Sequence, residues 1–467
     1  MKIEFIGATR EVTGSKFLIT TDAGKRILLD CGMFQGKGME TDALNRNLGF
    51  DPEELDYVIL THAHIDHSGL IPYLYKLGFR GSVVCTAATR DLCSIMLVDS
   101  GHIQELDAKW FNKKQAKKGL PFISPIYNVT HAEKCMKLFI TVALGRRLRI
   151  DDSISVKFTN TGHMLGSGAA NIRIVENGEA KNITYTGDIG RETSHILSGW
   201  EPSLQCDYLI TESTYGDRLH EPMQDAEREL LKIVRETCVE KQGKLIIPAF
   251  SVGRTQELVY TLNEFYNAGK LPQIEVFVDS PLSVNATGVF RTHTDSMNER
   301  VKETLLNDPD PFGFNSLHYI KDVEESKALN NYQKPCIIIS ASGMAEAGRI
   351  KHHISNNIEN PNNTILIVGY CTPTSLGARL QKPKLKEISI FGISHKVRAR
   401  IARIEAFSAH GDYCEMINYL SLQDKTKIQK TFLVHGEYSV QLAYKKHLEE
   451  AGFKHVLIPE VKDMFEL

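Results

Sequence analysis

The 467-residue chain lacks the features that would direct it out of the cell or into a membrane. Its N-terminus, MKIEFIGATREVTGSKFLI, has neither the basic segment nor the apolar segment of a signal peptide. No apolar stretch approaches the roughly 20 residues of a membrane-spanning helix. The nine cysteines are scattered without a CxxC pair, so neither a zinc ribbon nor a disulfide framework is indicated. We therefore expect a protein of the reducing cytoplasm with no membrane partner.

The chain also lacks an excess of either charge. Its 55 Lys and Arg residues oppose 57 Asp and Glu residues, and the formal net charge is -2. This balance gives no global argument for nucleic acid, so any anion-binding surface must be local. The basic run KWFNKKQAKKG is one candidate, although such a run is usually a solvated helix face. The strand-like KVRARIAR is another, with a salt-bridged solvent face as an equal alternative.

What the chain does have is THAHIDHSG, residues 61–69, directly after the apolar run YVIL. This segment places His62, His64, Asp66 and His67 within six positions. His and Asp are ordinary ligands of zinc and similar metals, and one cation needs only three or four protein ligands. A chance cluster on a solvated loop is the alternative, and it fits poorly with four such groups at the end of a strand-like run. The segment therefore predicts most of a metal site.

Further histidines and an aspartate stand where other strand-like runs end, in TNTGHMLGSG, TYTGDIG, AFSAHGD and FLVHGE. Each of them alone would be read as a turn residue. Together with the first cluster they supply about the number of ligands that two cations need, which is three each and one bridging carboxylate. The predicted ligands are His62, His64, Asp66, His67, His163, Asp188 and His435.

The pattern of predicted strands and helices divides the chain into three parts. Residues 1–216 are predicted to form a β-rich layer with helices. Residues 401–467 again have strand-like sequence patterns and are expected to complete that layer. Between them, residues 217–400 contain four strand-loop-helix units, which predict a parallel sheet covered by helices. Ligands bind beyond the carboxyl ends of such strands, where helix N-termini suit phosphate. Candidate substrate contacts in these loops are Arg254, Ser342, Gly343 and Ser375.

These motifs carry a resemblance to a known family. THAHIDH resembles the HxHxDH signature of the metallo-β-lactamase fold, and LLDCG with its Asp30 fits the ordered motifs of that superfamily. The segments ITESTYG, FSAHGD and LVHGE resemble motifs A, B and C of the β-CASP nucleases. The resemblance covers nearly the whole chain. It implies an α/β fold, namely an αββα metallo-β-lactamase sandwich with an inserted β-CASP domain and the active site between them.

The resemblance also implies roles for the candidate residues. His62, His64 and His163 would hold one zinc ion, Asp66, His67 and His435 a second, and Asp188 would bridge them, with manganese as an alternative metal. Asp30 would orient ligands from behind. Besides Asp66, the catalytic residues would be His410, as the general acid for the leaving oxygen, and Glu212, which would hold the imidazole of His410 in place.

The implied activity is a metal-dependent ribonuclease. Two cations would lower the pKa of a bound water toward about 7, and the resulting hydroxide would attack phosphorus. His435 resembles the RNA-processing branch, whereas the DNA-repair branch resembles Val at that position. The 32 residues after His435 and the lack of a module before residue 1 favour endonucleolytic cleavage of single-stranded RNA. GYCTPTSLGARL departs from the family by being less glycine-rich than the GTLGR-like loop of near relatives.

Four other readings stay open. A small-molecule hydrolase of the lactamase or glyoxalase type would leave the inserted units and His410 without a purpose. A non-catalytic RNA-binding subunit predicts lost ligands, and none is missing. A DNA-repair nuclease is disfavoured by His435, and a 5′-3′ exoribonuclease of the same family remains an alternative. The sequence also leaves the oligomeric state open, a homo-oligomer included.

Overall fold

The computed structural model describes residues 1–36, 40–220, 223–369, 371–372, 374–404 and 409–467. The chain divides into two compact units. Unit 1 consists of Met1–Ser194, Gly199–Leu219 and His410–Leu467. Unit 2 consists of His195–Ser198 and His220–Ala409. No helix in the described part of the chain is long and apolar enough to cross a membrane.

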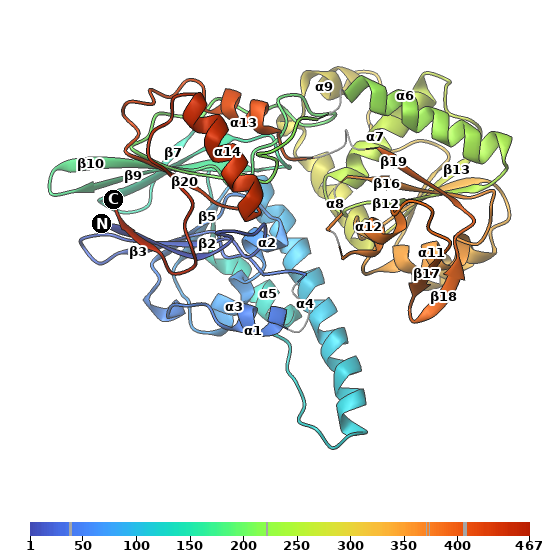
Figure 1. The fold of residues 1–467 in the computed structure, drawn as a ribbon, viewed down its shortest axis with the longest axis horizontal. Helices are drawn as coiled ribbons and strands as arrows, with labels where there is room; N and C mark the ends of the chain where they lie inside the picture. Colours follow the sequence, from blue (N-terminus) through green and yellow to red (C-terminus); the bar gives the residue numbers. More distant parts are fainter. Residues whose placement is uncertain (37–39, 221–222, 370, 373, 405–408) are drawn as a thin grey trace. The chain divides into compact units, whose positions relative to one another are not determined.

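Unit 1 is built on two seven-stranded sheets (Figure 1). The first has the order β22 (Met464–Glu466), β1 (Lys2–Gly7), β2 (Lys16–Thr20), β3 (Arg26–Leu29), β4 (Tyr57–Ile59), β5 (Ser82–Cys85) and β6 (Phe139–Thr141). The second has the order β21 (Val456–Leu457), β20 (Lys430–Leu433), β11 (Tyr208–Thr211), β10 (Glu179–Tyr185), β9 (Gly168–Glu176), β8 (Ile154–Asn160) and β7 (Arg147–Arg149).

The two sheets bury one apolar core between their inner faces. Inward side chains of both sheets form a single cluster, in which the rings of Phe5 and Phe432 lie 5.0 Å apart and those of Phe17 and Tyr185 lie 5.3 Å apart. Aromatic pairs at this separation add to the stabilisation from burial. The ENGE turn joins β9 to β10 with Asn177 and Gly178 at positive φ, as a two-residue hairpin requires.

Helices cover the outer faces of both sheets. Beside the first sheet lie α1 (Glu40–Arg46), α2 (Ile65–Ser68), α3 (Ile71–Lys76), α4 (Ala87–Ala116) and α5 (Val129–Cys135). Over the second sheet lie α13 (Tyr413–Tyr419) and α14 (Tyr438–Glu450), which share a buried cluster with β11 and β20. The layers therefore follow the order helix, sheet, sheet, helix, and the predicted αββα sandwich is confirmed.

Unit 2 contains the parallel sheet that the four strand-loop-helix units predict. Its order is β14 (Leu317–Ile320), β13 (Glu275–Asp279), β15 (Cys336–Ser340), β12 (Lys244–Pro248), β16 (Thr364–Val368) and β19 (Arg400–Ile404), and every neighbouring pair is parallel. The helices are α6 (Met223–Val234), α7 (Arg254–Asn267), α8 (Pro281–Thr292), α9 (Glu299–Leu305), α10 (Val323–Ala328), α11 (Arg349–Asn357) and α12 (Leu376–Leu380). A small hairpin joins β17 (Glu387–Ile390) to β18 (Ile393–Lys396).

Unit 2 ends at Ala409, further along the chain than the boundary predicted between residues 400 and 401. β19 pairs with β16 in the sheet of unit 2, and unit 1 resumes at His410. Within the basic segment KVRARIAR, Arg400 forms an ion pair with Glu236, as the salt-bridged alternative predicts for this residue. Residues 405–408 of the strand expected over RIEAFSAHGD lie outside the described residues.

Candidate metal centre

Strand direction brings distant polar residues to one edge of the second sheet. β10, β11 and β20 are mutually parallel, and β8 and β10 both run antiparallel to β9, so these four strands point the same way. The residues that follow them therefore emerge at the same edge. They are His163 after β8, Asp188 after β10, Glu212 after β11 and His435 after β20.

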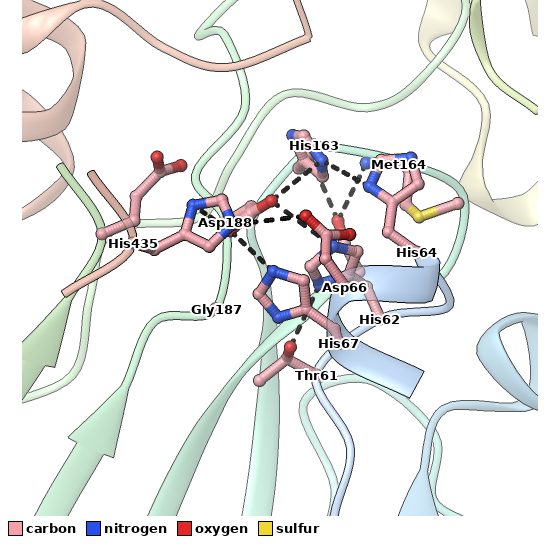
Figure 2. Close-up of polar contacts among 12 residues, drawn as sticks. Thr61, His62, His64, Asp66, His67, His163, Met164, Gly187, Asp188 and His435 are labelled. Carbon is pink, nitrogen blue, oxygen red and sulfur yellow. Dashed lines mark hydrogen bonds and ion pairs between the residues drawn. The ribbon is translucent and has the colours of Figure 1, made fainter. Parts of the chain in front are cut away.

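The 61–69 segment comes to the same place from the first sheet, after β4. Backbone hydrogen bonds fix its path, since Ser15 N donates to Asp66 O at 3.0 Å and Cys31 N donates to His67 O at 2.7 Å. A Cβ on Gly32 would lie 1.6 Å from the carbonyl oxygen of Asp66, so only glycine permits this approach. Figure 2 shows the imidazoles of His62, His67, His163 and His435 around Asp188, with that of His64 beside His163.

One carboxylate oxygen of Asp188 faces a first group of histidines. Nε2 of His62 and Nε2 of His163 each lie 3.4 Å from Oδ2 of Asp188. Nε2 of His163 also lies 3.1 Å from Nδ1 of His64. The ligand atoms of these four residues all lie within 4.8 Å of one another, so the group could hold one metal ion.

The other oxygen of Asp188 faces a second group. Nε2 of His67 lies 3.3 Å from Oδ1 of Asp188, and Nδ1 of His435 lies 3.5 Å from it. Nε2 of His435 lies 3.5 Å from Oδ2 of Asp66. Asp66, His67 and His435 again offer ligand atoms within 4.8 Å of one another. All seven predicted ligands are thus brought together, and Asp188 lies between the two groups.

The spacing and the lack of partners both fit a metal. Ligands about 2.1 Å from a tetrahedral ion stand about 3.4 Å apart, close to the distances within each group. Nε2 of His62, Oδ1 of Asp188 and Nε2 of His435 are buried and have no hydrogen-bond partner among the described residues. Buried polar atoms of folded proteins are normally satisfied, so these atoms indicate a bound group.

Burial and charge set most of these side chains in the form that binds a metal. Burial lowers the pKa of His62 and His163, and it lowers the pKa of His64 to about 3, so all three imidazoles are neutral. Burial alone would raise the pKa of Asp188, but the surrounding histidines outweigh it and hold that pKa well below its usual range. His67 is the exception, because Asp188 and Asp30 outweigh burial and raise its pKa well above the usual value. A metal ion would have to displace that proton.

Asp30 holds the ligands from behind. Its Oδ2 lies 2.7 Å from Nδ1 of His67 and accepts hydrogen bonds from the hydroxyls of Tyr185 and Thr61, both at 2.8 Å. Its Oδ1 accepts from the backbone N–H of Thr61 at 2.8 Å. Thr61 Oγ1 also lies 3.1 Å from Nδ1 of His62. With its oxygens occupied in this way, Asp30 suits the orienting role that the resemblance implies.

Thr214 holds His435 in a comparable way. Its hydroxyl lies 3.0 Å from Nδ1 of His435 and donates to the carbonyl oxygen of that residue at 3.1 Å. This pairing leaves Nε2 of His435 turned toward Asp66. His435 adopts φ 50° and Asp30 φ 54°, a left-handed conformation that costs non-glycine residues free energy and often occurs at functional sites. The sequence analysis missed Tyr185, Thr61 and Thr214, although Thr214 stands in the ITESTYG motif itself.

His410 and Glu212 lie beside Asp188, where the ring of His410 is 4.5 Å from that of His163 and 6.0 Å from that of His435. Nδ1 of His410 lies 3.1 Å from Oε2 of Glu212, and its Nε2 lies 3.9 Å from Oδ2 of Asp188. Glu212 is buried, and it also accepts hydrogen bonds from the backbone N–H groups of Ile189 and Thr214. Burial lowers the pKa of His410, but Glu212 and Asp188 outweigh it and raise the pKa to about 9. The imidazole therefore carries a proton at neutral pH.

The four candidate substrate contacts all lie in unit 2 and each has a local structural partner. Arg254 begins α7, is buried and forms an ion pair with Glu257. Ser375 caps α12 by accepting from Ala378 N at 3.2 Å, and Ser342 Oγ accepts from Glu346 N at 3.2 Å. A Cβ on Gly343 would meet the ring of Phe250 at 2.6 Å. Their contact with substrate stays a prediction.

Comparison with known proteins adds three matching families along the chain. Residues 10–237 match the metallo-beta-lactamase superfamily, and residues 255–380 match the Beta-Casp domain. Residues 394–459 match the Zn-dependent metallo-hydrolase RNA specificity domain. Together the three matches cover the seven candidate ligands and every strand of the parallel sheet except β12.

Several proteins are similar to this chain over almost its whole length. Ribonuclease TTHA0252 of Thermus thermophilus is 34% identical over 97% of this chain and 97% of its own length. An RNase J-like protein of Methanocaldococcus jannaschii is 32% identical over 95% of this chain and 94% of its own. Cleavage and polyadenylation specificity factor 73 of Drosophila melanogaster is 29% identical over 96% of this chain and 62% of its own.

Proposed function

This chain belongs to the β-CASP family of the metallo-β-lactamase superfamily, and from this premise we propose that it cleaves single-stranded RNA endonucleolytically with two zinc ions. Its action on RNA as a metal-dependent hydrolase follows from its ribonuclease homologues and its metallo-hydrolase domain. The number and identity of the metals, the endonucleolytic mode and the residue roles are the proposed part.

The observation that carries the proposal is the position of Asp188 between two groups of ligands. Oδ2 of Asp188 faces His62 and His163, and Oδ1 faces His67 and His435. A carboxylate so placed suits the bridge between two cations that grip one phosphodiester. When bound, the two ions would offset the negative charge of the phosphate and lower the pKa of a water molecule toward about 7. Manganese would suit the same His and Asp ligands.

The chain's own groups handle the proton of the leaving oxygen. Glu212 accepts from Nδ1 of His410, so the imidazole can present the proton on Nε2 to the reacting phosphate. A pKa near 9 would make His410 a weak acid at neutral pH. The positive charge of two bound cations would lower that value toward neutrality, where an imidazole is most useful as an acid. Departure of a protonated oxygen would leave a 3′-hydroxyl on one product and a 5′-phosphate on the other.

A cytoplasmic location remains part of the proposal. All nine cysteines are free and seven of them are buried, which suits a compartment where thiols stay reduced. Cell fractionation followed by detection of the chain would test the location independently of activity.

The test of the proposed activity uses RNA labelled at one end and the DNA of the same sequence, each with and without chelator. We expect internal fragments from RNA that carry 5′-phosphates, and no cleavage after chelation. Asp66→Ala is the matched inactive control, because Asp66 offers one of the ligand atoms of the second group. Release of single nucleotides from the 5′ end would indicate the exonuclease alternative, and equal cleavage of DNA would contradict the proposed preference for RNA.

A further inference from the structure

The second half of α4 extends beyond the body of unit 1 (Figure 1). Helix residues are buried at intervals up to Ala108, whereas none of residues 109–124 is buried. The chain then returns beside the helix, where Asn112 Nδ2 donates to Ile123 O at 2.9 Å and Asn112 Oδ1 accepts from Ile123 N at 2.8 Å. We call residues 103–123 the lysine arm.

The lysine arm concentrates positive charge in a chain whose formal net charge is slightly negative. Residues 109–118 contain five lysines and no acidic residue, against a formal net charge of -2 for the whole chain. All five are exposed, and none forms an ion pair within the part of the chain that the structure describes. They are Lys109, Lys113, Lys114, Lys117 and Lys118. Unpaired lysines on a projecting element are suited to a polyanion.

Exposed rings lie among these lysines. The side chain of Trp110 is 60% exposed and that of Phe122 is 70% exposed. Nζ of Lys114 lies 3.5 Å from the centroid of the Trp110 ring, which places charge and ring on one surface. Helical spacing also aligns Trp110 with Lys113 and Lys117. Aromatic faces beside cations are the combination on which single-stranded nucleic acids stack.

The other end of α4 is anchored beside the metal ligands. Thr86, which caps the helix, donates its hydroxyl proton to the carbonyl oxygen of Gly166 at 2.6 Å, and Thr89 donates to the same oxygen at 2.9 Å. Gly166 is three residues from His163. At a rise of 1.5 Å per residue, Trp110 stands about 35 Å along the helix from Ala87. At 3.4 Å per stacked nucleotide, this distance corresponds to about ten nucleotides.

We propose that the lysine arm is a second RNA-binding surface of unit 1, which holds single-stranded RNA by phosphate contacts and base stacking about ten nucleotides from the bond that is cut. This inference rests on the proposed function, because it needs RNA as the substrate. Exposed apolar side chains stand on both sides of the lysines along the arm, and the combination of charge and rings favours a polyanion with stacked bases over an apolar protein partner.

The first experiment removes charge from the arm. The variant Lys113→Gln, Lys114→Gln, Lys117→Gln is compared with a control that neutralises three exposed lysines elsewhere in unit 1, Lys2→Gln, Lys446→Gln, Lys454→Gln. We expect the Kd for an unstructured RNA of about 30 nucleotides to rise about tenfold in the arm variant alone. Each lost phosphate contact should flatten the salt dependence of log K by about 0.7, so the slope should fall by about 2.

The second experiment follows RNA binding through the fluorescence of Trp110. The chain has two tryptophans, so Trp200→Phe leaves Trp110 as the sole indole reporter. We expect its fluorescence to be quenched on titration with the RNA of about 30 nucleotides, and Trp110→Ala to weaken binding of that RNA about tenfold. A Trp110 signal that RNA leaves unchanged would contradict the proposal.

Two short substrates separate failure of the arm from failure of the active site. The arm variant should hydrolyse bis(p-nitrophenyl) phosphate and cut an RNA of about six nucleotides at the parent's rate, because neither reaches the arm. Loss of activity on these substrates as well would indicate damage to the metal site and would overturn the assignment of the arm. Equal effects of the arm and control variants on RNA binding would show that the arm lysines act only through the overall charge of the protein, which would contradict the proposal. Binding of an acidic protein to the arm without RNA would assign the arm to a protein partner instead.

Discussion

Nδ1 of His410 lies 3.1 Å from Oε2 of Glu212, although 198 residues of sequence separate the two side chains. Glu212 follows β11 in the second sheet of unit 1, and His410 is the position at which the chain returns to that unit. The pair therefore forms only when the segment that contains Glu212 and the C-terminal segment that begins at His410 fold together in unit 1. Its geometry leaves Nε2 of His410 as the ring atom turned toward Asp188, at 3.9 Å.

Replacing His410 should slow cleavage without emptying the metal site. We expect His410→Ala to lower kcat on single-stranded RNA by about 10²- to 10⁴-fold, the usual contribution of a general acid. Metal content should stay at the parent's level, because the seven candidate ligands are intact. His447→Ala, at a half-buried position in the last turn of α14 where the ring stacks on Tyr413, is the matched histidine control and should leave kcat unchanged. A His410→Ala enzyme as fast as the parent would show that another group protonates the leaving oxygen.

Glu212→Gln should shift the pH dependence of the reaction. Burial lowers the pKa of His410, and the Glu212 carboxylate is the largest influence that raises it. Removing that charge lowers the pKa, so the protonated acid is lost at a lower pH and the alkaline limb of the kcat profile should move toward acid. The measurement is kcat against pH for both enzymes at saturating RNA. An alkaline limb that stays in place would mean that it reports a different group.

The metal site should lose affinity in graded steps. His62→Ala and Asp66→Ala each remove a ligand atom and should abolish activity, and the parent should contain about two metal ions per chain by elemental analysis. Tyr185→Phe removes only the hydroxyl that donates to Asp30 at 2.8 Å. Loss of such a supporting contact typically weakens metal binding about 10- to 100-fold. Competition with a chromophoric chelator would measure it, and protein prepared without chelator that contains no metal would contradict the site.

The ligand groups could be predicted because short stretches of sequence are enough to recognise them. His62 to His67 are recognised by spacing alone, and His163, Asp188 and His435 by their place at strand ends. The supporting contacts could not be predicted in this way, since Tyr185 meets Asp30 across 155 residues and Thr214 meets His435 across 221. Such pairs depend on which strands become neighbours, and that order is a property of the folded sheets.

Element type was likewise more predictable than element length. The segment from Asp91 to about Trp110 suggests a helix, but α4 begins at Ala87, where Thr86 caps it. It continues through the basic run to Ala116, where no apolar face marks it. The C-terminal limit of unit 2 differs from the predicted boundary for a related reason. Strand β19 pairs with β16 in unit 2, and its own sequence does not indicate which sheet it joins.

In unit 2, the buried carboxylate of Asp279 joins β13 to α10 and α11. Asp279 at the end of β13 is fully buried and accepts hydrogen bonds from Arg349 Nη1 and His353 Nε2 at 2.6 Å and from Ser326 Oγ at 2.5 Å. Asp279→Ala leaves these donors unpaired and should lower the free energy of unfolding by about 3–5 kcal/mol. Glu299→Ala breaks an exposed pair with Lys302 and should cost less than about 1 kcal/mol. Urea unfolding midpoints compare the two, and equal midpoints would show that the buried cluster contributes little.

Lys16 should be a source of instability that a methionine removes. The side chain is fully buried, and its Nζ donates to the carbonyl oxygen of Gly32 at 3.0 Å and lies 4.3 Å from the centroid of the Phe34 ring. Burial lowers the pKa of Lys16 from 10.5 to about 8, more than the nearby Cys31 and Glu11 raise it. That difference corresponds to about 3 kcal/mol of lost stability when the group is charged. Lys16→Met leaves the Gly32 carbonyl without its donor, at a cost of about 1 kcal/mol.

The pH dependence gives the sign of this effect. Below pH 8 lysine is protonated in both the folded and the unfolded chain, so the folded protein bears the full cost and Lys16→Met should be more stable by about 1–2 kcal/mol. Between pH 8 and 10.5 the unfolded lysine binds a proton that the folded one has released, so the stability of the parent rises and the advantage of methionine shrinks. Urea midpoints of both proteins at pH 7 and pH 9.5 measure this. A variant less stable than the parent at pH 7 would mean that the contacts of Lys16 with Gly32 and Phe34 outweigh the burial of its charge.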